Sequence, residues 1–94
     1  MSEAPSAKKK YWITARIDEI DFEQKCVTIT KVEWNYRDER WETAFDRYGN
    51  PETYEISYDE KIEKMLDEYF EKRSVVAMMV CDEKIMKVKE EEFV

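Results

Sequence analysis

The chain has no histidine and a single glycine among its 94 residues. Without histidine it lacks the usual proton shuttle near neutral pH, the Ser-His-Asp and Cys-His arrangements, and every zinc site built on an imidazole. One glycine, Gly49, is too few for the dinucleotide-binding and phosphate-binding loops, in which several glycines allow close backbone approach. We therefore expect a protein that is not an enzyme and that holds no metal ion or other cofactor.

Cysteines and long apolar runs are also scarce. Cys26 and Cys81 are the only two cysteines, and no charged-then-apolar signal segment precedes them, so we expect two buried free thiols rather than a disulfide. The longest wholly apolar run, Val75–Cys81, is much shorter than the roughly 20 residues that a bilayer-spanning helix needs. These features predict a cytoplasmic protein that does not engage a membrane.

Negative charge exceeds positive charge. Sixteen Lys and Arg residues stand against 23 Asp and Glu residues, which gives a formal net charge of −7. Such a field repels duplex DNA and anionic membranes, because binding to them depends on neutralising phosphates with Lys and Arg. A partner with a basic surface fits this charge better.

Residues 1–10 (MSEAPSAKKK) differ in composition from everything that follows. They are small, polar or basic, which predicts a disordered basic leader that adds nothing to the core. Residues 11–94 contain no internal repeat and no linker. Since 43% of the chain is hydrophobic and 14% is aromatic, we expect these residues to fold as a single domain around one core.

Alternating apolar and polar residues predict a strand at 11–19 and a second strand at 26–34. A polar turn separates them, so the two runs predict an antiparallel hairpin. Ile29 and Val32 cannot both face the same side of a regular strand at their spacing. This predicts a bulge between them and a strongly curved sheet.

Residues 35–56 predict one or two short strands, at 41–45 and 53–56, joined by a turn. The turn falls at Tyr48-Gly49-Asn50-Pro51, which combines the usual turn-forming residue types. A lone glycine is most needed where φ is positive. We therefore expect a tight turn at Gly49.

An amphipathic helix at about 58–72 is the clearest predicted element. Its apolar residues recur with helical spacing, as the stripe Ile62, Met65, Leu66, Tyr69 and Phe70. Ser57 and Glu60 have the spacing of a capping box. After the helix, Val75–Cys81 predicts a strand buried on both faces, and a turn leads to a last strand at 85–88.

This order of elements predicts an α+β fold, a small curved antiparallel β-barrel with the order β-β-β-α-β-β and one helix. It resembles the oligonucleotide/oligosaccharide-binding (OB) fold, a five-stranded, partly open barrel in which a helix usually lies between the third and fourth strands. The resemblance covers residues 11–91 and depends on the element order and the curved first hairpin. An SH3-like barrel and an open sheet with one packed helix are the alternatives.

Tryptophan, tyrosine and arginine gather in the middle of the chain. These residue types are enriched at binding hot spots. Two residues of the first strand are expected to lie beside them. The candidate partner-binding residues are Trp34, Tyr36, Arg37, Arg40, Trp41, Arg47, Tyr48, Trp12 and Arg16.

Two functions compete for this segment. The leading hypothesis is docking of a protein, with the chain acting as an adaptor, an inhibitor or a mimic of nucleic-acid charge, because an acidic domain suits a basic surface. The alternative is stacking of the bases of single-stranded DNA or RNA, which the OB resemblance favours, since that fold uses its second and third strands in this way. Residues 34–48 carry three Arg and four acids, so an electrostatic funnel for phosphates is missing.

Overall fold

The fold is that of a computed structural model, which describes residues 10–91. The predicted leader therefore lies outside the described residues, apart from Lys10, which is already the first residue of a strand. The described residues form six strands and one α-helix with a short 3₁₀ helix before it. Their bounds are β1 Lys10–Asp21, β2 Cys26–Asn35, β3 Arg40–Thr43, β4 Thr53–Tyr58, η1 Glu60–Ile62, α1 Glu63–Lys72, β5 Val75–Cys81 and β6 Lys84–Glu90.

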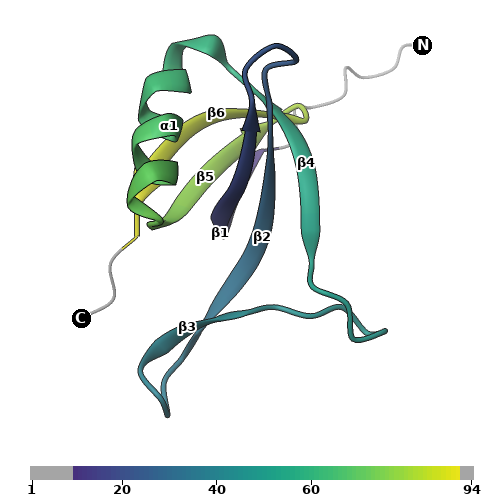
Figure 1. The fold of residues 1–94 in the computed structure, drawn as a ribbon. Helices are drawn as coiled ribbons and strands as arrows, with labels where there is room; N and C mark the ends of the chain where they lie inside the picture. Colours follow the sequence, from purple (N-terminus) through teal and green to yellow (C-terminus); the bar gives the residue numbers. More distant parts are fainter. Residues whose placement is uncertain (1–9, 92–94) are drawn as a thin grey trace.

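The strands form one mixed sheet that closes into a ring (Figure 1). The strand order is β1-β5-β6-β4-β2-β3, and an additional pairing of β1 with β2 closes the ring, while β3 continues outward from β2. The strand pairs within residues 10–91 are antiparallel except β4–β6, which is parallel. The expected purely antiparallel sheet was wrong at this pair. The chain crosses from β4 through the helix to β5 and turns back at the β5–β6 hairpin, so that β6 runs parallel to β4.

The core lies inside the ring. Alternate residues of the strands point inward, and Ala15, Ile29, Met78 and Ile85, from four different strands, are fully buried. Leu66 of the helix joins the same cluster. The α+β class and the position of a helix between strands are therefore confirmed.

The irregularity that we expected in β2 lies in β1 instead. The register of β1 against β2 shifts between Ile17 and Glu19, whereas β2 pairs without a shift through the predicted bulge site. Ile29 belongs to the core cluster of the ring. Val32 is also buried but does not belong to that cluster. It lies at the point where the pairing of β2 with β4 ends and its pairing with β3 begins. The side chains of Ile29 and Val32 thus point to opposite faces of β2, and a regular strand accommodates both without a bulge.

Helix α1 packs on the core through the predicted stripe. Leu66 is fully buried, and three more stripe residues pack against the core cluster, namely Ile62, Tyr69 and Phe70. Met65 remains exposed at the edge of the stripe. No helix among residues 10–91 has the length and apolar character needed to cross a bilayer.

A side-chain cap begins the helical segment and a left-handed residue ends it. The carboxylate of Asp59 accepts the N–H of Lys61 at 3.2 Å, at the start of the 3₁₀ turn. The capping box predicted from Ser57 and Glu60 was therefore wrong, because Ser57 is still part of β4. Arg73, with φ of 58°, ends the helix in the left-handed conformation.

Positive φ angles mark the tight turns. Gly49 has φ of +86°, which confirms the turn predicted there. Asp82 and Glu83 have φ of 56° and 64° and form the two-residue connection between β5 and β6, as in a type I′ hairpin turn. The outer face of β5 is less covered than expected, since Met79 and Cys81 are only half-buried.

Candidate partner-binding surface

Most of the predicted binding residues lie on a projection from the ring, which we call the arm (residues 32–52). It consists of the outer half of β2, strand β3 and the loop that leads to β4, and in Figure 1 it extends away from the helix. Backbone hydrogen bonds fasten its base. Lys31 donates its N–H to Glu52 O and accepts the N–H of Ala44, both at 2.9 Å. The arm therefore leaves and re-enters the ring at one place.

Trp34 and Trp41 lie directly opposite each other across the β2–β3 ladder. Their ring centroids are 5.2 Å apart with an interplanar angle of 72°, the edge-to-face geometry that aromatic pairs favour. Both rings are half-buried. Val32, two residues before Trp34 and therefore on the same side of the strand, is buried. The tryptophan pair thus helps to hold the two strands of the arm together.

Arg40 lies on the opposite side of the arm. It pairs with Asn35 across the ladder, and the alternation of the strands places it with Glu33 and Glu42. Its Nε is 3.0 Å from Glu42 Oε2, and its terminal nitrogen is 3.9 Å from Asp38 Oδ2. Hydrogen bonds from Asn35 and Arg40 lower the pKa of Glu42. The predicted patch is therefore divided, with the tryptophan pair on one side and an acid-paired arginine on the other.

The turn at the tip of the arm is held by Asn35. Its Oδ1 accepts the backbone N–H groups of Arg37 at 2.9 Å and of Asp38 at 3.0 Å. Tyr36 is 75% exposed in this turn, and the Arg37 side chain is exposed beside it. An ordered turn therefore presents Tyr36 and Arg37 to solvent.

The second loop of the arm is held in a similar way by Asp46. Its Oδ1 accepts the N–H groups of Tyr48 at 2.8 Å and of Asn50 at 3.0 Å, and its backbone pairs with Gly49 and Asn50. Tyr48 is 77% exposed, and the guanidinium of Arg47 lies 5.4 Å from its ring centroid. Arg47 and Tyr48 therefore form a compact cation–π unit on a capped loop.

We expected Trp12 and Arg16 to lie beside the aromatic segment of the arm, but they do not. The β1–β2 ladder reaches only to Ala15, so Trp12 has no partner on β2. It faces outward over β5 and β6 instead, where Lys89 Nζ lies 5.3 Å from its ring centroid. Arg16 pairs with Thr30, in the part of β2 that belongs to the ring. Seven of the nine predicted residues therefore belong to the arm, and the other two lie on the outer face of β1.

The outer surface of β2 and β4 carries the side chains that the OB resemblance would place under a stacked strand. Its outward positions alternate with the buried Val27 and Ile29. They are short and hydroxylic or acidic, namely Thr28, Thr30, Thr53 and Glu55. These four outward positions therefore carry no aromatic side chain.

Comparisons of the chain with protein-family models, with curated proteins and with solved structures find no match.

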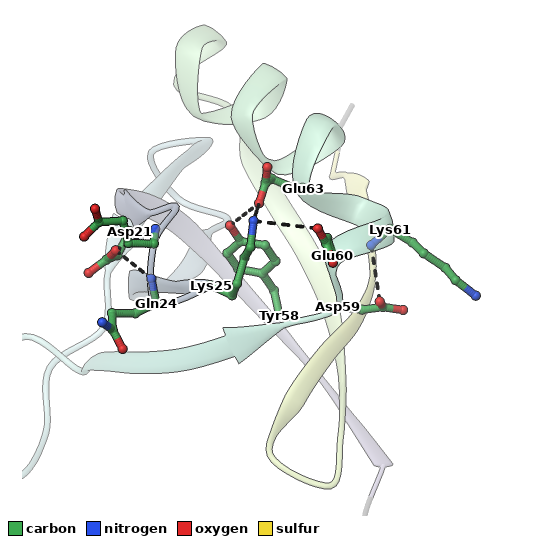
Figure 2. Close-up of polar contacts among 9 residues, drawn as sticks. Asp21, Gln24, Lys25, Tyr58, Asp59, Glu60, Lys61 and Glu63 are labelled. Carbon is green, nitrogen blue, oxygen red and sulfur yellow. Dashed lines mark hydrogen bonds and ion pairs between the residues drawn. The ribbon is translucent and has the colours of Figure 1, made fainter.

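A polar cluster joins the β1–β2 turn, the end of β4 and the start of the helix (Figure 2). Glu63 Oε1 accepts a hydrogen bond from the Tyr58 hydroxyl at 2.7 Å, and Lys25 Nζ is 2.8 Å from the same oxygen. Hydrogen bonds from Lys25 and Tyr58 lower the pKa of Glu63, and the bond to Glu63 raises the pKa of Lys25. Burial, followed by the hydrogen bond to Glu63, raises the pKa of Tyr58. Each shift favours the protonation state that makes the contact at neutral pH, so the cluster suits a structural role better than proton transfer.

The two thiols are free and half-buried, not fully buried as we expected. Cys26 Sγ lies 3.6 Å from Glu55 Oε2, and burial, followed by the charge of Glu55, raises the pKa of Cys26. A raised pKa keeps this thiol protonated and weakly nucleophilic. Among the described residues no group of three or more His, Cys, Asp or Glu side chains is placed to hold a metal ion.

A cleft beside the base of the arm was not predicted. Its volume is about 530 Å³, and it lies between the start of β1, strand β4 and the β5–β6 turn. Lys31 lines it because this residue continues the inward alternation of Val27 and Ile29, which is the signal that sequence reasoning overlooked. The other residues that line it are Tyr11, Trp12, Ile13, Tyr54, Glu55, Ile56, Ser57 and Glu83.

Proposed function

We propose that this chain is a non-catalytic binding module that acts in the cytoplasm and docks a protein partner through the arm. The observation that carries the proposal is the pair of capped turns that present Tyr36 and Tyr48, each about three-quarters exposed, beyond the ring. Tyrosine supplies large contact area at a small cost in side-chain entropy. Because Asn35 and Asp46 already order the two turns, little further ordering is required on binding.

The charges of the arm favour a protein over a nucleic acid as its partner. Arg40 is engaged by Glu42 and lies near Asp38, so two carboxylates of the arm offset its positive charge. Glu33 and Glu42 face each other on the same side of the arm, and this carboxylate pair repels a phosphate backbone. A partner with basic side chains beside an apolar contact site complements this surface.

The ring itself supports an OB-like barrel as the scaffold. Five strands make the ring in chain order β1, β2, β4, β5 and β6, and the helix lies between the third and fourth of them. Strands β4 and β6 pair at Ser57–Lys84 and Tyr58–Ile85 within the described residues, which matches a partly open barrel. On this proposal the barrel is a rigid support, and the arm is a long connection between its second and third strands.

Affinity capture with paired variants tests the arm. The immobilised protein is compared with the double variant Tyr36→Ser/Tyr48→Ser and with Phe22→Ser, which alters an exposed aromatic residue in the β1–β2 turn. We expect one or a few proteins to be retained by the wild type and by Phe22→Ser, and at least tenfold less of them by the double variant. Retention of the same proteins in equal amounts by all three would overturn the proposal. Loss of the partner from Phe22→Ser alone would place the site on the β1–β2 turn.

A further inference from the structure

The outer face of β1, β5 and β6 is a surface distinct from the arm. The antiparallel registers place Trp12 opposite Met79, and Met79 opposite Lys87, so the three side chains form one row across the strands. Their neighbours along the strands, Met78 and Val88, are buried in the core. The row therefore points outward.

This face is positively charged although the chain has a net charge of −7. Among residues 10–91 the outward positions carry no acid from Lys10 to Arg16 of β1, along β5, or from Lys84 to Lys89 of β6. The acids nearest to these positions are Asp18, Glu19 and Asp21 in the second half of β1, Asp82 and Glu83 in the turn, and Glu90 and Glu91 at the end of β6. The outward cations, together with the exposed tryptophan, define what we call the basic face, namely Lys10, Trp12, Arg16, Lys84, Lys87 and Lys89.

The cations of the basic face are not neutralised by the part of the chain that the structure describes. The ion pairs within residues 10–91 involve Lys25 and Arg40, neither of which belongs to this face. Lys89 contacts an aromatic ring rather than a carboxylate, with its Nζ 5.3 Å from the centroid of Trp12. The positive charge is therefore available to an anionic ligand.

Trp12 indicates what kind of anion fits. Its side chain is 53% exposed, and the contact with Lys89 leaves ring surface open to solvent. The flat face of a nucleobase stacks on such a ring, while Lys and Arg side chains bind phosphates. A peptide made of Asp and Glu alone offers the charge without a ring. A duplex keeps its bases stacked inside and cannot offer one to Trp12.

We propose that the basic face binds a short single-stranded nucleic acid, with its cations on successive phosphates and a base stacked on Trp12. Along β1, the distance from Lys10 to Arg16 is about 20 Å at roughly 3.3 Å per residue, and the three strands together are about 10 Å wide. This area accommodates a few nucleotides. The proposal is independent of the arm, because it uses none of the arm's residues.

Fluorescence anisotropy with labelled ten-nucleotide oligo-dT and oligo-U at low salt tests the proposal on the full chain. We expect micromolar binding of at least one of them by the wild type, at least tenfold weaker binding by Lys87→Glu/Lys89→Glu, and a change below about twofold in Lys61→Glu/Lys64→Glu. The control double variant changes the net charge equally on the helical segment. A further variant, Lys87→Gln/Lys89→Gln, repeats the test with neutral side chains, and circular dichroism confirms that each variant is folded.

Two further readouts separate stacking from charge alone. The logarithm of the affinity for a single strand falls with the logarithm of salt concentration by about 0.7 per neutralised phosphate, so we expect a slope of about −2 to −3.5. Tryptophan emission should be quenched by the oligonucleotide in the wild type and largely unquenched in Trp12→Phe.

Each contrary result overturns the proposal. No binding at tens of micromolar protein would do so, as would equal weakening by both double Lys→Glu variants. Tighter binding of a ten-residue poly-Glu peptide than of either oligonucleotide would assign the face to an acidic peptide instead. Weakened oligonucleotide binding in Tyr36→Ser/Tyr48→Ser would move the nucleic-acid site to the arm, whereas failure of the partner capture leaves this test unaffected.

Discussion

Tyr58 donates its phenolic hydrogen to Glu63 Oε1 at 2.7 Å, although the two residues belong to different elements. Lys25 reaches the same oxygen from the β1–β2 turn (Figure 2). The backbone reinforces this junction, since Tyr58 donates its N–H to Lys25 O at 3.1 Å. The start of the helix is thereby fixed to the closed end of the first hairpin.

Removal of the Tyr58 hydroxyl should weaken this junction. Tyr58 is buried, and a hydrogen bond to a charged group contributes about 1.5 to 3 kcal/mol. We expect Tyr58→Phe to lower the free energy of unfolding by about 1.5 kcal/mol, measured by urea titration. Tyr54→Phe is the control, because its hydroxyl bonds Glu52 at 2.9 Å on an exposed residue, and its effect should stay below about 0.5 kcal/mol. Equal effects of the two variants would contradict a special role for the junction.

The same junction predicts a dependence of stability on acid pH. Contacts with Lys25 and Tyr58 lower the pKa of Glu63 from its ordinary value of 4.5. A carboxylate with a depressed pKa in the folded state stabilises the fold above 4.5, and this stabilisation is lost as the pH falls through the depressed value. We therefore expect the urea midpoints of wild type and Glu63→Gln to differ at pH 7 and to converge as the pH falls below the depressed pKa of Glu63. A control, Glu68→Gln, alters an exposed residue on the same helix and should show no such convergence.

Local periodicity was enough to predict the helix and the order of the strands along the chain. The stripe from Ile62 to Phe70 predicts the helix, and Gly49 predicts the turn of the arm loop. Both predictions succeed because each signal lies within a few neighbouring residues. The parallel pairing of β4 with β6 could not be predicted in the same way. This pairing depends on where the helix places the start of β5, and so on the position of β6 beside β4, which is a property of tertiary packing.

The candidate surfaces were only partly predictable for a related reason. Adjacent positions in a strand point to opposite sides, so a segment rich in Trp and Arg is divided by the pleat, as Trp34 and Arg40 are. Residues distant in sequence are united by register. Trp12 meets Lys89 only because β5 lies between their strands. Net charge, as a sum over the chain, conceals a face on which one sign dominates.

Replacement of Gly49 should test the backbone of the second arm loop alone. A Cβ at this position would meet no heavy atom within 4 Å, so any cost of Gly49→Ala comes from its φ of +86°. We expect about 1 kcal/mol of destabilisation, and a smaller loss for Gly49→Asn, because Asn tolerates positive φ better. Thermal or urea unfolding of both variants provides the measurement. An Ala variant as stable as the wild type would show that the loop relaxes away from this conformation.

The tryptophan pair predicts a measurable coupling inside the arm. Because the two rings contact each other edge to face at 5.2 Å, the changes Trp34→Leu and Trp41→Leu should not be additive. A double-mutant cycle should give an interaction energy of about 0.5 to 1.5 kcal/mol. The pair Trp12→Leu and Trp41→Leu, on separate surfaces, provides the control cycle and should be additive within about 0.5 kcal/mol. An additive first cycle would mean that each ring packs on other parts of the arm rather than on its partner.

Strand pairing in the arm predicts that it opens more readily than the ring. Strand β3 pairs with β2 through the four residues from Arg40 to Thr43 and lies outside the closed order of the ring, whereas β5 is held by β1 on one edge and β6 on the other. Few buried contacts and an open strand edge lower the free energy of local opening. Hydrogen–deuterium exchange followed by mass spectrometry should therefore show faster exchange of residues 40–43 than of Val75–Cys81. In Trp41→Ala we expect exchange to accelerate in the arm and to stay unchanged in β5. Equal acceleration in both segments would mean that the arm and the ring unfold as one cooperative unit, and the arm could then not be treated as an independent binding element.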